Sequence, residues 1–249
     1  FEDNAEFGYG MLLAQNTIRD RLKAKVEKIA EKTTDEAVKA AAAEYLETYT
    51  VGATNGTATD KLVAALEALD CDCEERAEVL KNKDFLAKKS QWIFGGDGWA
   101  YDIGYGGVDH VLASKKDINI MVFDTEVYSN TGGQSSKATK TGATAQFAAG
   151  GKETKKKDLA GMAMTYGYVY VAQIAMGADF NQTVKAIAEA EAYPGPSLII
   201  AYAPCINHGI KKGMSKAQTE EQLAVECGYW NNFRYNPAAE GDKFSLDSK

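Results

Sequence analysis

Two glycine-rich, acidic stretches contain the residues of this sequence best suited to chemistry. The first is Gly95-Gly96-Asp97-Gly98-Trp99-Ala100-Tyr101. Its glycines let a backbone approach an anion closely, a helix N-terminus behind them favours negative charge, and Asp97 offers a carboxylate to a divalent cation. The second, from Asp124 to Gln134, is dense in side-chain oxygens. Because Mg²⁺ takes an octahedral set of hard oxygens, often carboxylates together with phosphates, the two stretches favour a site for Mg²⁺ and a diphosphate.

The alternative interpretation of both stretches is structural. A lone Gly-Asp-Gly is typical of a tight turn between a strand and a helix, and Asn130-Thr131-Gly132-Gly133 is compatible with a loop at positive φ. The combination favours a site, because the two loops follow consecutive expected strands and the carboxyl ends of parallel strands lie side by side. Spacing alone does not decide between a site and two turns.

Short apolar runs from Gln91 onward predict the strands that position these loops. The runs are rich in β-branched and aromatic residues and are bounded by glycine, proline or polar turn residues. The expected strands cover 92–94, 118–123, 168–172 and 198–202, and helical patterns cover 103–114, 158–166, 182–192 and 216–227. This alternation predicts an α/β fold with a mostly parallel sheet and helices on both faces.

The residues before this region have a helical pattern. Apolar positions such as Leu12, Ile18, Leu22 and Val26 recur at steps of three to four among charged residues. We expect a break at 33–35, where an N-cap begins a helix over 37–45, and a turn-rich linker at 51–56 before helices over 61–69 and 74–83.

The expected organisation has three parts. They are a helical segment over 1–90, the α/β domain over 91–235 and a polar C-terminal tail over 236–249. Because the chain begins with Phe1 rather than Met and the tail has no evident closing element, we expect a fragment of a larger polypeptide.

Composition and charge limit the function classes. The 249 residues include 28 basic and 35 acidic ones, a formal charge of −7, which argues against nucleic acid as the main partner. The longest apolar runs, such as 197–203, are far shorter than the ~20 residues that cross a bilayer, so no membrane partner is expected. The 4 cysteines do not form a dense disulfide framework. We therefore expect a soluble protein of the reducing cytoplasm.

Three long motifs closely resemble pyruvate:ferredoxin (flavodoxin) oxidoreductases. They are Gly95 to Gly104, Asp124 to Ser136, and Tyr202-Ala203-Pro204-Cys205-Ile206-Asn207-His208-Gly209. The opening Phe1-Glu2-Asp3-Asn4-Ala5-Glu6-Phe7-Gly8 also resembles this family, at a point well inside its polypeptide. The resemblance covers most of the chain, is densest over 91–213 and is weakest over 33–89.

The resemblance implies a thiamine diphosphate-binding fold and a specific reaction. The family converts pyruvate and coenzyme A into acetyl-CoA and CO₂, and electrons pass through [4Fe-4S] clusters to ferredoxin or flavodoxin. This chain would bind the diphosphate end of the cofactor. The Glu that starts ylide formation belongs to a second, homologous domain without a counterpart here, so the isolated chain is expected to be inactive. The complete enzyme, with its remaining domains, is expected to be a homodimer.

The resemblance also implies roles for individual residues. The cofactor-binding positions that match the family are Gly96, Asp97, Gly98, Trp99, Thr125, Val127, Asn130 and Thr131. Among these, Asp97, Thr125 and the backbone carbonyl of Val127 are the implied Mg²⁺ ligands. Asn130 is the implied catalytic residue, near the reactive end of the cofactor.

Cys205 has two interpretations. A single cysteine after a buried strand is typically a small core residue. In the family, the cysteine of this motif is a ligand of the [4Fe-4S] cluster nearest the thiamine, so Cys205 is the implied ligand in the full-length enzyme. The other ligands come from a segment that precedes Phe1 in the family. A cluster requires four thiolates, and we expect none on this chain alone.

Several alternatives stay open. The enzyme could act on another 2-oxoacid, since most substrate contacts would lie in other domains. The chain could be a non-catalytic module of the same fold, or an α/β domain for another phosphate ligand. The basic run Lys152 to Lys157 is expected to be a solvated loop. The less favoured alternative is that its positive charge attracts the phosphates of coenzyme A or an acidic ferredoxin. The family also occurs in hydrogen-producing organelles.

Overall fold

The chain consists of two compact units. The computed structural model describes residues 4–208 and 210–248, so Phe1, Glu2, Asp3 and Gly209 of the motifs above, and the side chain of His208, lie outside the described part. The α/β unit comprises Phe1–Tyr9 and Gln91–Lys249, and the helical unit comprises Gly10–Ser90. Helix α1 (Ala5–Lys32) begins in the first and continues in the second. Across the described residues, no helix is long and apolar enough to cross a membrane.

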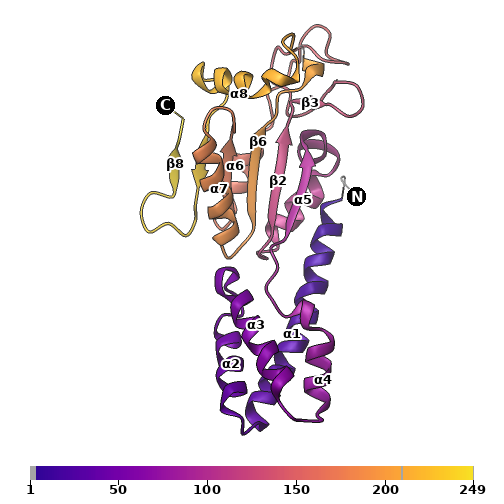
Figure 1. Ribbon diagram of the computed structural model, residues 1–249. Coiled ribbons are helices and arrows are strands. Elements are labelled where there is room, and N and C mark those ends of the chain that lie inside the picture. Colours follow the sequence, from indigo (N-terminus) through magenta and orange to yellow (C-terminus); the bar gives the residue numbers. More distant parts are fainter. Residues whose placement is uncertain (1–3, 209, 249) are drawn as a thin grey trace. The chain divides into compact units, whose positions relative to one another are not determined.

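A six-stranded mixed sheet forms the centre of the α/β unit (Figure 1). Its order is β1-β2-β6-β5-β7-β8. The parallel strands are β1 (Trp92–Gly96), β2 (Asn119–Asp124), β6 (Ser197–Tyr202) and β5 (Tyr170–Ile174). The antiparallel strands β7 (Phe233–Tyr235) and β8 (Phe244–Leu246) complete one edge. The predicted mostly parallel sheet is therefore confirmed.

Strands β2, β5 and β6 are covered on both faces. Alternate side chains Met121, Tyr170, Ala172 and Ile199 pack against Ala186 and Ala190 of α7 (Phe180–Ala192). The residues between them, which point to the opposite face, are fully buried as well: Ile120, Val122, Val171, Leu198 and Ile200. Helix α6 (Leu159–Met164) also contacts β5 and β6. Runs that are buried on both faces explain why the strand sequences are almost continuously apolar.

The helix expected over 103–114 differs from the structure. A π-helical turn, η2 (Gly98–Ile103), follows β1 and is separated by Gly104 from α5 (Tyr105–Ala113). A Cβ on Gly104 would lie 2.2 Å from the Trp99 ring, so the indole packs tightly against this break. Beyond β6 the chain forms η3 (Ile206–His208), η4 (Met214–Lys216) and α8 (Ala217–Glu226).

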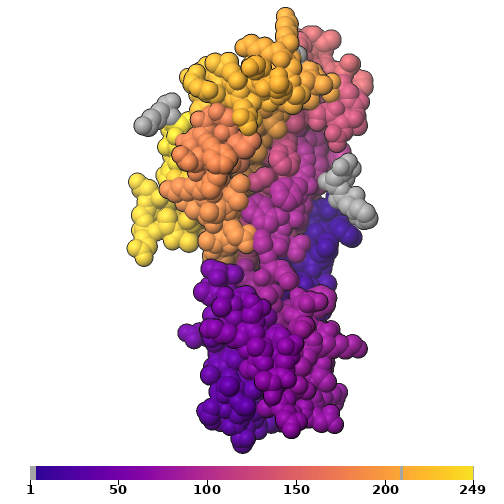
Figure 2. All heavy atoms as spheres, in the orientation of Figure 1, coloured from indigo at the N-terminus to yellow at the C-terminus, as the bar shows by residue number. Residues whose placement is uncertain are grey.

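The segment expected to be a polar tail contains β8. Arg234 on β7 binds both carboxylate oxygens of Asp247 at 2.9 Å and Glu189 of α7 at 2.7 Å. Asp247 also accepts from Gln182 at 3.1 Å. These bonds attach residues 244–248 to the sheet, and the space-filling view shows them, in yellow, at its outer margin (Figure 2).

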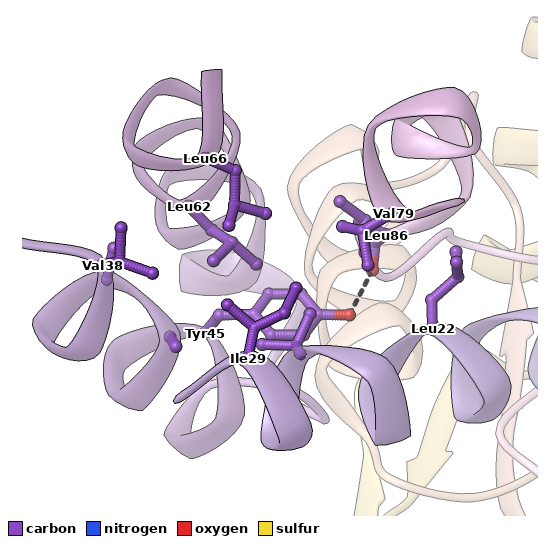
Figure 3. Close-up of a cluster of buried hydrophobic side chains, with 11 residues drawn as sticks. Leu22, Ile29, Val38, Tyr45, Leu62, Leu66, Val79 and Leu86 are labelled. Carbon is purple, nitrogen blue, oxygen red and sulfur yellow. Dashed lines mark hydrogen bonds between the residues drawn. The ribbon is translucent and has the colours of Figure 1, made fainter. Parts of the chain in front are cut away.

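The helical unit packs the rest of α1 with α2 (Glu36–Glu47), α3 (Gly52–Ala68), α4 (Glu74–Lys81) and the turn η1 (Lys83–Phe85). Its core contains Leu22, Ile29, Val38, Tyr45, Leu62, Leu66, Val79 and Leu86 (Figure 3). The Tyr45 hydroxyl donates to the Leu86 carbonyl at 3.2 Å. Asp35 caps α2 by accepting from the amides of Ala37 and Val38, in agreement with the predicted break.

The predicted linker at 51–56 is helical in the structure, since α3 already begins at Gly52. Asn55 explains the difference. Its Oδ1 accepts from Arg19 at 3.2 Å and from the Lys88 amide at 2.7 Å, and its side chain is fully buried. These long-range bonds fix residues whose local composition favours a turn.

Candidate cofactor and metal site

The two glycine-rich loops lie at the same end of the sheet. Strands β1 and β2 are parallel neighbours, and Gly96 is paired with Phe123. Asp97 directly follows β1 and Asp124 is the last residue of β2. Both residues therefore lie at the carboxyl ends of adjacent strands, where open α/β sheets bind their ligands. The hairpin β3 (Val127–Tyr128) and β4 (Gln134–Ser135) follows directly and is at that end in the ribbon view (Figure 1).

Oxygen atoms of the predicted metal ligands converge on the Thr125 hydroxyl. Thr125 Oγ1 lies 2.7 Å from Asp97 Oδ1 and 2.9 Å from the carbonyl oxygen of Val127. The Thr125 amide also donates to Asp97 Oδ1, at 3.1 Å. A hydroxyl has one proton and can satisfy one of these two acceptors at a time. A carboxylate, a hydroxyl and a carbonyl gathered in this way form a donor set suited to a hard divalent cation.

Asp97 is a buried acid with a perturbed pKa. Its side chain is 1% exposed, and burial together with the nearby Asp124 carboxylate raises its pKa to about 6. Hydrogen bonds from Thr125 and Ser136 partly oppose this shift by favouring the charged form. A bound cation would stabilise the ionised carboxylate in the same way, so the local electrostatics favour positive charge.

A cavity of about 450 Å³ opens beside the oxygen cluster. Every member of the expected cofactor-binding set contributes to its wall, namely Gly96, Asp97, Gly98, Trp99, Thr125, Val127, Asn130 and Thr131. The apolar side chains Phe94, Ile103 and Phe123 line it as well. The cavity thus joins a polar end, near Asp97, to an apolar wall.

Glycines shape this cavity in two ways. A Cβ on Gly98 would lie 2.4 Å from the Tyr128 ring, so this glycine allows the two loops to meet. A Cβ on Gly96 would meet no atom within 4 Å, because this position faces open space. The open side of Gly96 leaves room for a ligand close to the backbone.

The third motif contacts the second loop. Asn207 Nδ2 donates to the Ser129 carbonyl at 3.0 Å. A Cβ on Gly133, which has φ +83°, would lie 3.0 Å from Asn207. The intervening Asn130 and Thr131 are exposed at the cavity wall. All three motifs quoted for the resemblance therefore meet at one end of the sheet.

Cys205 lies apart from the oxygen cluster. It is a half-buried free thiol that lines a second cavity of about 330 Å³ together with Cys227 and Tyr202. Thr125 borders both cavities. The described residues contain no cluster of three or more His, Cys, Asp or Glu side chains able to hold a metal ion.

Sequence reasoning missed two residues that support the site. Ser136 Oγ donates to Asp97 Oδ2 at 2.7 Å. Lys156, assigned to a solvated loop, has a side chain only 18% exposed that lies 2.7 Å from Asp124. No local pattern marks either residue, because their partners are more than thirty positions away in the sequence.

Comparison with known proteins identifies the family. Residues 77–201 match the model described as "Thiamine pyrophosphate enzyme, C-terminal TPP binding domain". The chain belongs to this thiamine pyrophosphate enzyme family. The matched range includes both glycine-rich loops and strands β1, β2 and β5, and thiamine pyrophosphate is the same compound as thiamine diphosphate.

Individual relatives match over the whole chain. It is 55% identical to a pyruvate-flavodoxin oxidoreductase of Enterobacter agglomerans and 57% identical to a pyruvate:ferredoxin oxidoreductase of Moorella thermoacetica, in both cases over 100% of this chain and 22% of the relative. A mitochondrial pyruvate dehydrogenase [NADP(+)] of Euglena gracilis is 46% identical over 14% of its length. The family resemblance seen in the motifs is thereby confirmed, and the chain spans a minor part of each relative.

The chain also aligns with a solved structure, a 2-oxoglutarate:ferredoxin oxidoreductase from Magnetococcus marinus with 2-oxoglutarate, coenzyme A and succinyl-CoA bound. The alignment covers 63% of this chain and 46% of the chain in that structure. The TM-score is 0.44 and the sequence identity 22%.

Proposed function

We propose that this chain is the diphosphate- and Mg²⁺-binding part of a thiamine diphosphate-dependent pyruvate:ferredoxin or pyruvate:flavodoxin oxidoreductase. The observation that carries the proposal is the convergence of Asp97, Thr125 and Val127 on one cavity wall, in a chain of the thiamine pyrophosphate enzyme family. Identities of 53% to 57% to three pyruvate-flavodoxin or pyruvate:ferredoxin oxidoreductases support pyruvate as the substrate.

The residues present fit a Mg²⁺ ion. Asp97 Oδ1, Thr125 Oγ1 and the Val127 carbonyl would supply the protein ligands. The remaining octahedral positions would be filled by diphosphate oxygens and water, as Mg²⁺ commonly requires. Ser136 would hold the second oxygen of Asp97 and so orient the carboxylate toward the ion.

The cavity fits the diphosphate end of the cofactor. Gly96 and Gly98 would bring backbone amides close to the phosphates, and Thr131 would face them from the second loop. Asn130, exposed at the cavity wall, would lie near the reacting atoms as the catalytic candidate. When bound, the cofactor supplies a thiazolium carbon that adds to a 2-oxo carbon and accepts the electrons left as CO₂ departs. The role of this chain is to bind and orient it.

Other functions depend on the rest of a larger, cytoplasmic and homodimeric enzyme. Cys205 would be a ligand of its [4Fe-4S] cluster, coenzyme A would accept the acetyl group, and ferredoxin or flavodoxin would accept the electrons. The intact donor set of Asp97, Thr125 and Val127 argues against a module that has lost cofactor binding.

Calorimetric titration with thiamine diphosphate, with and without Mg²⁺, tests the proposal on the polypeptide that contains this chain. We expect binding that requires the metal and is lost in Asp97→Ala. Asp242→Ala removes an exposed carboxylate of the β7–β8 loop and should bind like the wild type. Absence of binding to the wild type would overturn the proposed function. Tight binding without metal would overturn the assignment of Asp97 and Thr125 as metal ligands.

A further inference from the structure

A buried ion-pair network adjoins the oxygen cluster through the two sequence neighbours of Thr125. Asp124 and Glu126, which flank Thr125 in the sequence, are 0% and 2% exposed. Lys156 Nζ contacts both, at 2.7 Å from Asp124 Oδ2 and 3.3 Å from Glu126 Oε1. A cation between two buried carboxylates offsets their mutual repulsion, which is strong in a low-dielectric site.

The other oxygens of the two carboxylates are also satisfied. The Glu126 amide donates to Asp124 Oδ1 at 3.2 Å. The Tyr101 hydroxyl donates at 2.8 Å to Asp124 Oδ2, the oxygen that Lys156 also contacts. The Tyr229 hydroxyl donates to Glu126 Oε2. The Glu126 carbonyl accepts from Thr139. The backbone and side chain of Glu126 are therefore held from several elements at once.

The conformation of Glu126 matters for the metal site. Its φ is +63°, a left-handed value that residues with a side chain rarely adopt. This turn lies between Thr125 and Val127 and brings the hydroxyl of the first within 2.9 Å of the carbonyl of the second. The arrangement of two of the three proposed metal ligands thus depends on a backbone conformation that the surrounding contacts impose.

We propose that Lys156 is a positioning residue for the metal site. By holding Asp124 and Glu126 it keeps the turn at Glu126 closed, and the closed turn directs the Thr125 hydroxyl and the Val127 carbonyl toward Asp97. The inference rests on the proposed function, because it assigns the Asp97 cluster to a divalent cation, and it adds a residue that contacts neither the metal nor the substrate.

Removing the charge of Lys156 should change the cation affinity in opposite directions for an electrostatic role and for a positioning role. If Lys156 acted only as a nearby positive charge, its removal would strengthen cation binding, because a repulsive contribution would be lost. If it positions the ligands, its removal weakens cation binding by about tenfold or more, the usual cost of losing a supporting contact.

The experiment measures Mn²⁺ affinity by electron paramagnetic resonance, in the presence of thiamine diphosphate, on the same polypeptide as above. We expect Lys156→Met to weaken Mn²⁺ binding by about tenfold or more. Lys155→Met is the matched control: it removes the same charge from the exposed neighbouring residue and should stay within about twofold of the wild type. Lys156→Arg, which keeps the charge, should recover most of the loss.

A second pair of variants leaves the charge unchanged. Tyr229→Phe removes only the hydroxyl that Glu126 accepts from, and we expect it to weaken Mn²⁺ binding by about two- to tenfold. Tyr202→Phe, in the same cavity wall, is its control and should be neutral. This pair decides the question if Lys156→Met does not fold.

Three results separate the possible failures. Mn²⁺ binding by Lys156→Met as tight as that of Lys155→Met, or tighter, overturns the positioning role and leaves the proposed function intact. If Lys156→Met does not fold, equal binding by Tyr229→Phe and Tyr202→Phe overturns the positioning role in the same way. A wild-type protein that binds no Mn²⁺ in the presence of thiamine diphosphate overturns the proposed function, and with it this inference.

Discussion

At the scale of single residues, Asp97 is both a proposed metal ligand and a buried acid whose ionisation destabilises the folded, metal-free protein. Its pKa is raised from 3.8 to about 6, chiefly by burial. The folded state therefore holds a proton that the unfolded chain releases between these pH values. Stability that is fully present below pH 4 is lost as the pH rises through 6.

This pKa shift predicts a pH dependence of the metal-free protein. At 1.36 kcal/mol per pKa unit, the free energy of unfolding should fall by at most about 3 kcal/mol between pH 4 and 7. Asp97→Asn, which carries no charge, should remove most of that decrease. Urea unfolding at several pH values, with metal chelated, measures it; equal slopes in the two proteins would contradict the assignment.

Residues also show where sequence reasoning succeeds and where it stops. Asp97 stands out because glycines surround it in a loop after an apolar run. Ser136 and Lys156 do not stand out, because their importance comes from partners brought close only by folding. A lysine among lysines is typical of a solvated loop, and nothing in the sequence indicates that one of them meets two buried carboxylates.

At the scale of elements, the buried Arg19 holds the helical unit together. It donates to the carbonyls of Leu86 at 3.0 Å and Tyr49 at 2.9 Å and to Asn55 Oδ1 at 3.2 Å. Its guanidinium also lies 4.1 Å from the centre of the Tyr49 ring. One side chain from α1 thus connects the end of α2, the start of α3 and the segment after η1.

Replacing this arginine should destabilise the helical unit. Arg19→Met leaves buried acceptors without donors, and we expect a loss of about 3 kcal/mol in the free energy of unfolding. Arg21→Met is the control, because Arg21 is 57% exposed and its ion pair with Glu78 should contribute less than about 1 kcal/mol. Denaturant unfolding followed by circular dichroism compares the two. A change in Arg19→Met as small as in the control would refute this role.

Elements were predictable where the local pattern agreed with the fold. The parallel strands are short apolar runs between turn residues, and all of those predicted form in the structure. The start of α3 was not predictable, because Asn55 is fixed by Arg19 and Lys88 from other elements. The strand β8 has three residues, too few to show a period, and becomes visible only through its pairing with β7.

At the scale of the whole molecule, the proposed function makes this chain one part of a larger active centre. The chain spans 22% of the length of the pyruvate-flavodoxin and pyruvate:ferredoxin oxidoreductases compared above. The resemblance assigns the group that activates the cofactor to another domain. We therefore expect no sustained pyruvate-dependent dye reduction by the purified chain with thiamine diphosphate, Mg²⁺ and coenzyme A. Sustained turnover, measured against a reaction without pyruvate, would show that the chain is catalytically complete.

The antiparallel edge of the sheet has a consequence for solubility. A strand at the edge of a sheet offers unpaired backbone groups to any extended chain, and long flat edges promote aggregation. Here the outer strand β8 is three residues long, and bonds from Arg234 to Asp247 follow directly after it. An extended segment of another molecule could form only a few backbone hydrogen bonds with β8 before it reached the Arg234–Asp247 ion pair. The short final strand therefore limits unwanted self-association at that margin.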